Sequence, residues 1–598
     1  MAERGGHEPT IPAPDPLERH LATRAAADHG IAVDNWAGGI PEKMAEVPQV
    51  RVGRRWVSML WLIPLGLIGL IVAIAIAQHL RTYSWMQDFI RDYPGTGSFA
   101  PNVEGGFPWW LRWQHFFNIL FMLFIIRAGL QILADHPRLT LDSGSTPGRE
   151  WLRLRGPVPA DRMDPSQPER VWTAKDDAVA LPRQVGLPGF RHSIGLARWW
   201  HFTFDLLFVI NGAIFFVLLF TTSQWQRVVP QSWDVFPNAL STAVQYASLD
   251  FPPNEGFTHF NGLQVLTYFV TIFVAAPIAI VTGLLQGPSI AARFGTARGV
   301  FNRQVARTVH FLVLAWMVFF ILVHTLMIWI TGLLGNLNHI TLGTNTGSWW
   351  ALAIYGAGMA VVVVLWAAAS PFTIRHPDTV RRIGQRMVGW IKGLMEWSDP
   401  RAEYEEKDIS PFFWPNGEVP VSDEFKALAA GGFADYRLRV DGLCENPTTF
   451  SHEQLKAMPK REQITQHYCI QGWSAIAKWG GVPMSDIMDV VRPTADAEYA
   501  VFYSFGGGAE TGDDIVYYYA HRIENMRHRL TILAYEMNGE PLDITHGAPL
   551  RLRDENELGF KQVKWIQAVE FVESFAHLGA GQGGYNEDQE FYGYREPI

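Results

Sequence analysis

Six long apolar stretches constrain this chain more than any other feature of its sequence. All six lie between about residues 57 and 371, and each has 23 or more mostly apolar residues. Because about 20 such residues in a helix cross the roughly 30 Å hydrocarbon core of a bilayer, they predict six transmembrane helices. The expected spans are Val57–Leu80, Trp110–Leu133, Trp199–Thr222, Leu263–Gln286, Thr308–Gly332 and Trp349–Pro371.

The polar remainder of the 598 residues flanks this bundle. Residues 1–50 are rich in Ala, Pro and charge and lack the apolar core of a signal peptide, so they predict a mobile tail. We expect a membrane domain over 51–375, an amphipathic linker over 376–408 and a globular domain over 409–598. Within the linker, Arg381 to Trp397 predicts a helix on the membrane surface that acts as a hinge.

Basic residues set the expected orientation of the spans. They are concentrated between the second and third spans, between the fourth and fifth, and after the sixth, whereas the opposite loops hold only Arg81, Arg91 and Arg227. Because cytoplasmic loops carry the excess of Lys and Arg, both termini and the globular domain are expected on the cytoplasmic side of a bacterial-type inner membrane. Arg54 and Arg55 are interpreted as a basic flank of the first span rather than a twin-arginine signal.

Short alternating strands replace the apolar stretches after Ile409. Tyr436–Val440, Tyr499–Tyr503 and Val563–Phe571 alternate as strands do, and Asn538-Gly539 predicts a hairpin turn. The fold class is therefore multi-domain: an all-α six-helix transmembrane bundle joined to a mixed α+β, strand-rich domain. The net charge of -9 is divided unequally among the loops and gives no indication of a nucleic-acid partner.

The two cysteines, Cys444 and Cys469, exclude several kinds of centre. They are too few for a disulfide scaffold, a cysteine-rich zinc site or a four-cysteine iron-sulfur cluster. Cys444 is interpreted as structural. Cys469 stands beside His467 and Trp473 in a glycine-containing stretch where backbone can approach a large ligand. Its thiolate suits a redox-active metal whose other ligands come from a cofactor, and the simpler alternative is a small core residue.

Four histidines lie inside the expected spans, at His115, His201, His310 and His324. An ionisable side chain in hydrocarbon is costly unless it is paired, so each is a functional candidate. The 14 residues from His310 to His324 are close to four helical turns, which places both rings on one helix face about 21 Å apart. That separation fits two cofactors, one near each membrane surface.

The expected depth in the membrane assigns a partner to His310 and to His324. His201 and His310 lie near the cytoplasmic ends of their helices, whereas His115 and His324 lie in the outer half. A b-type haem takes two axial imidazoles from facing helices. We therefore expect an inner haem b between His201 and His310 and an outer haem b between His115 and His324.

Other interpretations of the intramembrane polar residues stay open. Any one of the four histidines can be a hydrogen-bonded packing residue. Asp205 and Arg127 are interpreted as groups that orient a ligand or neutralise a haem propionate, with a proton pathway as the alternative. His79 and His259, at the outer mouth, are either surface residues or substitute outer ligands.

The stretches around these histidines resemble a known family. RWQHFFNILFMLFIIRAGLQIL, ARWWHF and ARTVHFLVLAWMVFFILVHTLMIWITG are similar to the b-type cytochrome subunits of nickel-iron hydrogenases and formate dehydrogenases. The resemblance covers roughly residues 55–375 and implies a di-haem membrane protein that exchanges electrons with quinone. In that family one helix carries two histidines at this spacing.

The globular part resembles the molybdopterin domain of the sulfite oxidase family. The similar stretches run from about Ser410 to Glu573 and include SPFFWPNGEVP, ILAYEMNGEPLDITHGAPLRLR and ELGFKQVKWIQAVEF. The resemblance implies that Cys469 is the protein ligand to molybdenum. It also implies that the pterin and its phosphate are held by Asn416, His546, Arg551, Gly559, Phe560, Lys561 and Lys564. A phosphate favours such basic groups and free backbone N–H groups, although the three basic residues can also form an exposed strand face.

The segment CIQGWS departs from the cysteine motif of animal and plant sulfite oxidases, and their substrate-binding arginine cluster is not evident around Cys469. It is nearer to bacterial methionine-sulfoxide reductase subunits, which take electrons from a haem-bearing membrane partner. His467 and His521 are candidates for polar groups of the pocket.

These features predict a membrane-bound molybdenum oxidoreductase. It would pass electrons between a molybdenum-molybdopterin site and membrane quinone through two haems b, with oxygen-atom-transfer chemistry on a small-molecule substrate. The alternative is a haem-binding sensor or transporter with a non-catalytic pterin-like domain. The sequence leaves open the substrate, the direction of electron flow and the oligomeric state, a homodimer included.

Overall fold

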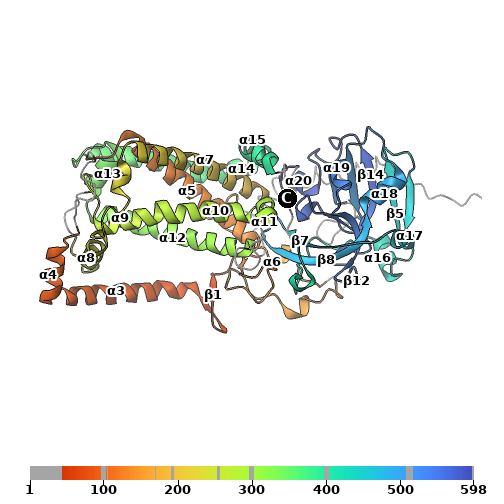
Figure 1. Ribbon diagram of the computed structural model, residues 1–598, viewed down its shortest axis with the longest axis horizontal. Coiled ribbons are helices and arrows are strands. Elements are labelled where there is room, and N and C mark those ends of the chain that lie inside the picture. The colour runs from red at the N-terminus through yellow and green to blue at the C-terminus, as the bar shows by residue number, and fades with distance from the viewer. Residues whose placement is uncertain are drawn as a thin grey trace, which may run out of the picture.

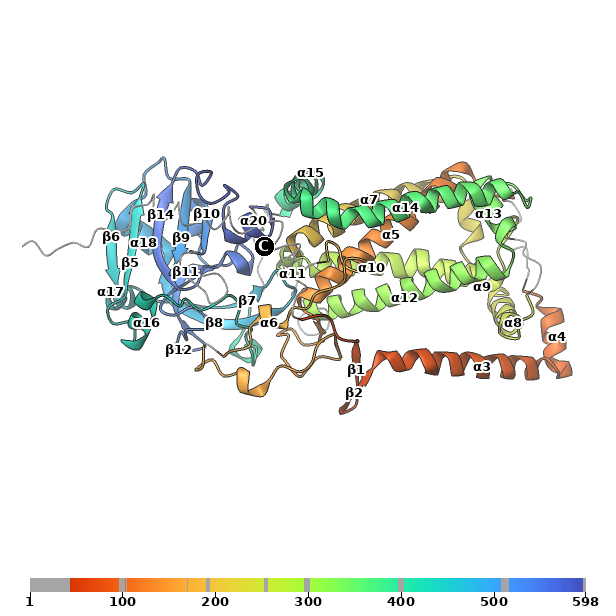
Figure 2. The same ribbon diagram turned by 180° about the vertical axis from the view of Figure 1, so that it is seen from behind.

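The chain folds into an elongated molecule with a helical bundle at one end and a strand-rich domain at the other (Figures 1 and 2). The computed structural model describes residues 43–95, 103, 105–168, 170–189, 194–251, 256–294, 302–395, 403–506 and 516–594. The loop between α5 and α7 and the helix α15 lie at the junction of the two parts. The fold class expected from the sequence is therefore confirmed.

Within the described residues, six helical segments are long and apolar enough to cross a membrane. They are Met59–Leu80 (η1 and α3), Trp109–Asp135 (α5), Ile194–Thr221 (α7), Gly262–Gln286 (α9, η4 and α10), Arg303–Ile330 (α12) and Trp349–Arg375 (α14). Their ends lie within about five residues of the expected ones. The largest differences are at the starts of α7 and α12, where polar residues extend the helix toward the junction.

Capping residues set where these helices begin. The Asn302 side chain accepts hydrogen bonds from the backbone N–H groups of Gln304 and Val305, so α12 starts at Arg303. Asn261 and Gln264 form a reciprocal capping box at the start of α9. The fourth span also contains a π-helical segment, η4 (Val270–Ala275), which the sequence did not predict. Such a segment is rare and occurs mostly as a single wide turn inside an α-helix.

The helix α3 (Leu62–Leu80) stands apart from the other spans (Figure 1). Its most apolar window is 0% buried within the protein, whereas α5 packs along α7 and α10 packs along α12. α3 contacts α8 (Val235–Ala247), and its remaining apolar surface is stable where lipid surrounds it. At the far end of the bundle, short helices α4 (Ser84–Asp92), α8 (Val235–Ala247) and α13 (Leu333–Thr341) connect the spans.

A small antiparallel sheet ties the start of the described chain to the α5–α7 loop. Its strand order is β2-β1-β4-β3, with β1 at Gln49–Val52, β2 at Arg55–Ser58, β3 at Arg138–Leu139 and β4 at Leu152–Arg153. Arg54 and Arg55 lie at the turn between β1 and β2. Residues 1–42 of the expected tail lie outside the described residues, and the last two residues of the expected tail, 49 and 50, are part of β1.

Two sheets form the C-terminal domain. The first has the order β10-β9-β14-β5-β6, from Tyr518–Arg522, Tyr499–Ser504, Ile566–Val572, Arg437–Gly442 and Thr448–Ser451. The second has the order β12-β11-β8-β7, from Glu540–Pro541, Thr531–Met537, Ser474–Pro483 and Arg461–Tyr468, and β13 (Arg551–Asp554) also pairs with β11. The three expected strands correspond to β5, β9 and β14. The predicted turn is confirmed, since Asn538 and Gly539 have φ values of 55° and 86°.

The amphipathic segment after the sixth span forms α15 (Pro377–Met395), which packs on α7. Val380 and Val388 of α15 form one buried cluster with Trp199 of α7 and Phe591 from the end of the described chain. The Trp199 indole donates from Nε1 to the Phe591 carbonyl oxygen at 2.8 Å. The hinge expected in this segment stays a prediction.

The two halves also share a core. The largest buried cluster contains strand residues of the C-terminal domain together with Trp172, Ala174 and Ile194 from the membrane half. The bundle and the C-terminal domain are therefore joined by a packed interface as well as by the α14–α15 segment.

Candidate functional site

Two pairs of histidines face each other within the helix bundle. The rings of His201 on α7 and His310 on α12 have centroids 6.4 Å apart, with planes at 70°. The rings of His115 on α5 and His324 on α12 have centroids 6.3 Å apart, with planes at 55°. The structure thus brings together the pairs expected from their depth in the membrane, one pair toward each end of α12.

The nitrogen atoms of the pair nearer the C-terminal domain are oriented by backbone groups. His201 Nδ1 lies 3.0 Å from the Ile125 carbonyl oxygen, and His310 Nδ1 lies 3.1 Å from that of Ala279. A histidine held through Nδ1 offers Nε2 to a metal, which is the usual arrangement for a metal-bound imidazole. His201 Nε2 is 3.5 Å from an Asp205 carboxylate oxygen, so Asp205 lies beside the ring as expected.

The spacing of each pair fits one iron atom between two rings. With metal–nitrogen bonds of about 2.0 Å and about 1.1 Å from nitrogen to ring centre, two opposed imidazoles have centroids about 6.2 Å apart. A Cβ atom added to Gly129 would come 3.0 Å from His201, so glycine makes room for that ring on α5. Bis-histidine haem binding is therefore compatible with both pairs.

Arg127 is buried in contacts that link α5 to other segments of the membrane domain. Its guanidinium is 1% exposed and donates to the carbonyl oxygens of Gly186 and Trp366 at 3.1 and 2.6 Å. It also lies over the Trp366 ring at 4.6 Å. These contacts tie α5 to α14 and to the α5–α7 loop. His79, on the isolated α3, lies 3.1 Å from the Tyr83 hydroxyl, and His259 is half-buried in the segment before α9.

Cys469 lies in the tight loop between β7 and β8 of the C-terminal domain. Its side chain is 2% exposed, and its Sγ is 3.9 Å from Asn416 Nδ2 and 3.7 Å from Gln471 Oε1. Burial raises the pKa of the thiol to about 12, so a bound metal cation would be needed to displace its proton near neutral pH. No group of three or more His, Cys, Asp or Glu side chains suited to a metal occurs among the described residues. Any metal at Cys469 therefore depends on ligands that a cofactor supplies.

A cluster of rings lies beside the cysteine loop. The Phe413 ring lies against the rings of His467, Trp473, Trp479 and His546, with centroids 5.1 to 5.6 Å apart. The guanidinium groups of Arg551 and Arg553 lie over the Trp479 ring at 4.7 and 4.4 Å. Arg553 is paired with Glu555 at 2.7 Å. The cluster thus combines flat apolar surfaces with the guanidinium of Arg551, which suits an aromatic, phosphate-bearing ligand.

Three buried donors in this region lack an acceptor within the described part of the chain. They are the indole nitrogens of Trp473 and Trp479 and Nε of Arg551. A buried N–H group without an acceptor costs free energy, and a ligand rich in oxygen and nitrogen acceptors would satisfy all three. The residues present therefore fit a pterin group with a phosphate.

The other expected pterin-binding residues surround the same loop. His546 is fixed by Asp543 at 2.7 Å and by the Phe413 carbonyl at 3.1 Å, and Arg551 donates to the His546 carbonyl at 2.8 Å. The Lys564 ammonium donates to the carbonyl oxygens of Asn416 and Thr545. Burial and the neighbouring Arg551 lower the pKa of Lys564 well below its ordinary value.

His467 and Gly559 meet at the edge of this cluster. His467 Nδ1 is 2.9 Å from Arg553 Nη1, and burial together with the two arginines holds the pKa of the imidazole well below its ordinary value. A Cβ atom on Gly559 would overlap the His467 ring, so this position requires glycine. Glycine allows such a close approach because it lacks a Cβ atom.

Three further candidates lie in internal contacts. His521 uses both ring nitrogens, at 2.8 Å from Asp554 Oδ2 and 2.9 Å from the Lys561 carbonyl. The Lys561 ammonium is 2.6 Å from Glu587, and the Phe560 ring packs on Tyr592 at 4.8 Å. These contacts lie within the protein, and the expected part of Phe560, Lys561 and His521 in ligand binding stays a prediction.

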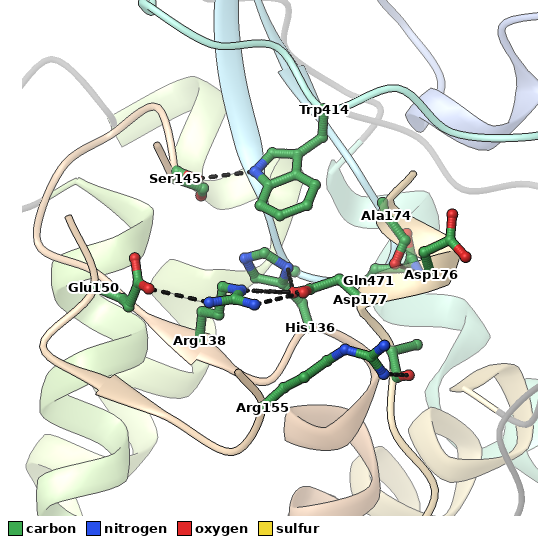
Figure 3. Close-up of polar contacts among 12 residues, drawn as sticks. His136, Arg138, Ser145, Glu150, Arg155, Ala174, Asp176, Asp177, Trp414 and Gln471 are labelled. Atoms are coloured by element: carbon green, nitrogen blue, oxygen red, sulfur yellow. Dashed lines mark hydrogen bonds and ion pairs between the residues drawn. The ribbon is translucent and has the colours of Figure 1, made fainter. Parts of the chain in front are cut away.

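The α5–α7 loop contacts Trp414 and Gln471 of the C-terminal domain (Figure 3). Trp414 donates from Nε1 to the Ser145 carbonyl at 2.9 Å, and Gln471 donates from Nε2 to the Ala174 carbonyl at 3.4 Å. Within the loop, Arg138 is 1% exposed and is held by Asp177 and Glu150 at 2.7 and 3.0 Å. The contacts of Trp414 and Gln471 with this loop have no local signal in the sequence, because they join segments that are remote in the chain.

Comparisons with known proteins match the two halves separately. The family model described as prokaryotic cytochrome b561 matches residues 106–343, and that described as oxidoreductase molybdopterin binding domain matches residues 422–577. The YedZ1 protein of Azospira oryzae, named as a protein-methionine-sulfoxide reductase subunit, is 35% identical over 210 residues, which cover 35% of this chain and 72% of that protein.

Two catalytic subunits are also similar. The protein-methionine-sulfoxide reductase catalytic subunits MsrP of Xanthomonas axonopodis pv. citri and Xanthomonas campestris pv. campestris are each 33% identical over 159 residues. These cover 25% of this chain and 49% of the subunits, so the chain spans about half the length of these relatives.

Among solved structures, the sulfane dehydrogenase SoxCD from Paracoccus pantotrophus matches 24% of this chain and 39% of its own, with 23% identity and a TM-score of 0.21. Both expected resemblances are nevertheless confirmed by the family matches and by the relatives. The chain belongs to the prokaryotic cytochrome b561 family, fused to a molybdopterin-dependent oxidoreductase domain of the sulfite oxidase family.

Proposed function

We propose that this protein transfers electrons from membrane quinol through two haems b to a molybdenum-molybdopterin site, where a small oxygen-atom donor is reduced. The observation that carries the proposal is the placement of His310 and His324 along α12, each opposite a second histidine, on the helix that leads to the domain containing Cys469. The two pairs lie at two depths within the bundle and would give electrons a path along it.

In this proposal His201 and His310 hold one haem and His115 and His324 hold the other. The centroid separations of 6.4 and 6.3 Å support it, as do the backbone acceptors on Nδ1 of His201 and His310. Asp205, beside His201, would orient that ligand. Electron transfer across the bilayer requires both pairs, because a single haem spans only part of its thickness.

Cys469 would hold the molybdenum, and the surrounding residues would hold the pterin and its phosphate. A bound molybdenum-pterin group supplies two-electron oxygen-atom exchange. The chain supplies orientation: Trp473, Trp479 and Arg551 offer unsatisfied donors, and Asn416 and Gln471 lie beside the sulfur. The burial of Cys469 and of the ring cluster beside it would keep bulk water away from a metal bound there.

The substrate class that we propose is the sulfoxide, with methionine sulfoxide as the first member to test. Its support is that the YedZ1 and MsrP relatives are named as subunits of protein-methionine-sulfoxide reductases. One sulfoxide, two electrons and two protons give one thioether and one water, and the oxidation of one quinol to quinone supplies those electrons and releases two protons. The haems carry the electrons one at a time.

Metal analysis of the purified protein tests this proposal. We expect about one molybdenum and two irons per chain, a b-type absorbance in the dithionite-reduced protein and quinol-dependent reduction of methionine sulfoxide. Iron without molybdenum would instead support a haem-binding sensor, and neither metal would support a transporter. A colourless preparation would refute the electron-transfer role.

We also propose that the C-terminal domain faces the cytoplasm. The loops rich in basic residues, α5–α7 and α10–α12, meet this domain at the same end of the bundle. Protease treatment of sealed, right-side-out vesicles should leave the domain intact, whereas inverted vesicles should lose it. Cleavage in the right-side-out vesicles would place the domain outside.

A further inference from the structure

The first turn of α12 holds the backbone of the cysteine loop. Arg303 donates from Nη1 to the carbonyl oxygens of Cys469 and Trp473 at 3.3 and 3.1 Å, and from Nη2 to Cys469 at 3.3 Å. Gln304 donates from Nε2 to the Gly472 carbonyl at 3.0 Å and to Ser474 Oγ at 3.2 Å. Two successive residues of a membrane helix therefore fix this loop near its start and at its end.

Both side chains are buried, at 9% exposure for Arg303 and 1% for Gln304. A buried guanidinium is tolerated only where its N–H groups find acceptors. The third nitrogen of the Arg303 guanidinium, Nε, donates to the carbonyl oxygen of Gln286, at the end of α10, at 2.9 Å. The acceptors of these four bonds are neutral carbonyl oxygens, so none of them neutralises the positive charge of Arg303.

The positive φ of Gly472, rather than a lack of space, favours glycine at the point where the loop lies beside α12. Gly472 has a φ of +107°, a conformation that favours glycine, and a Cβ atom there would lie 3.5 Å from the Arg307 guanidinium carbon. Arg307 itself donates to the carbonyl oxygens of Arg138 and His136. The same helical turn thus joins the cysteine loop to the α5–α7 loop.

The turn that holds Cys469 is also close to a histidine of the inner pair. His310 follows Arg303 by seven residues, which is two helical turns or a rise of about 10 Å. The Ala279 carbonyl that orients His310 belongs to α10, the helix whose last residue, Gln286, accepts from Arg303. The α10–α12 pair is therefore a rigid connection between the His310 ring and the cysteine loop.

We propose that Arg303 and Gln304 are positioning residues for electron transfer between the inner haem and the group bound at Cys469. By holding the loop on α12, they fix the distance between donor and acceptor. In each transfer the haem iron loses one electron and the acceptor gains one, and no bond forms or breaks in this step. The inference rests on the proposed function and adds the connection between its two redox centres.

Paired assays on the full-length protein test the role of these residues. Reduced methyl viologen, a small soluble dye, delivers electrons to the metal directly, whereas duroquinol delivers them through the haems. We expect Arg303→Gln to lower duroquinol-driven reduction of methionine sulfoxide at least about tenfold and viologen-driven reduction less than about threefold, with haem and molybdenum contents unchanged. Arg303→Lys, which keeps the charge but not the forked donors, should be intermediate.

Arg382→Gln is the matched control, because Arg382 is an exposed arginine on α15. It should leave both rates at the wild-type level. An equal fall of both rates in Arg303→Gln would show that Arg303 only supports the fold of the metal site, and unchanged rates would also overturn the inference.

A measurement without substrate separates this inference from the proposed function. Ferric haem broadens the molybdenum EPR signal of the partly reduced protein to an extent that depends on the distance between them. We expect weaker broadening in Arg303→Gln than in the wild type, and equal broadening would contradict the positioning role. A wild-type protein that holds both metals yet leaves methionine sulfoxide unreduced would refute the substrate while this measurement still decides the role of Arg303.

Discussion

His115 of α5 and His324 of α12 meet with ring centroids 6.3 Å apart, at the opposite end of α12 from the pair formed by His201 and His310. Because both pairs depend on α12, substitution of one α12 histidine should remove one haem and leave the other. His324→Ala should lower the haem content from about two to about one per chain, measured by the pyridine haemochrome absorbance. His310→Ala should lower it by the same amount.

His79→Ala is the control for these two variants. His79 is exposed on α3 and contacts Tyr83, so its replacement should leave the haem content unchanged. If His79→Ala removed a haem and His324→Ala did not, the outer ligand pair would have to be reassigned.

Cys469→Ser should abolish turnover and lower the molybdenum content, because a serine hydroxyl is a poor replacement for a soft thiolate ligand. The reduced haem spectrum should stay at the wild-type intensity, since the four histidines belong to the bundle. The matched control is Cys444→Ser, a cysteine that is only partly buried and lies outside the ring cluster. Turnover retained in Cys469→Ser would exclude this residue as the metal ligand.

Asp177→Ala should destabilise the junction between the halves. Asp177 is 0% exposed and pairs with the equally buried Arg138 at 2.7 Å, so its removal leaves a buried guanidinium with Glu150 as its remaining acidic partner. Loss of one member of a buried ion pair costs about 3–5 kcal/mol. The thermal unfolding midpoint of the detergent-solubilised protein should fall by several degrees. Asp161→Ala, at an exposed pair with Arg170, should leave the midpoint near the wild-type value.

Asp543 should give the C-terminal domain an acid-sensitive contribution to stability. Burial raises the pKa of its carboxyl, but hydrogen bonds from His546 and Thr545 outweigh burial and lower the pKa to about 2, from an ordinary value of 3.8. A lowered carboxyl pKa stabilises the folded state above pH 3.8, and this contribution is lost as the pH falls toward 2. Asp543→Asn should therefore melt below the wild type at neutral pH, and the difference should shrink in that acid range. A difference that grew on acidification would contradict this assignment.

The sequence predicted the features that depend on local periodicity. The six spans, the strands β5, β9 and β14 and the Asn538-Gly539 turn each follow from residues adjacent in the chain. The pairing of His115 with His324 was also accessible, because depth in a bilayer orders side chains along one axis.

The features that escaped prediction depend on contacts between remote segments. The expected span starts at Thr308 and so assigns Arg303 and Arg307 to a loop, yet they are the first and fifth residues of α12. Asn302, a favourable N-cap, is the local signal for that start. That Arg303 reaches Cys469, 166 positions later, has no local signal. His521 was expected in the pocket because of its polarity, and its bonds to Asp554 and Lys561 come from strand pairing that the sequence did not specify.

The junction described above also bears on the order in which the protein matures during synthesis. The contacts of Ser145 with Trp414 and Ser474 join residues 269 and 329 positions apart. The α5–α7 loop leaves the ribosome long before either partner exists, so these contacts can form only after residues 414 and 474 have been translated. Such distant contacts form late and slowly, and a ribosome pause or a chaperone that shields this loop in the interval would raise the yield of correctly assembled protein.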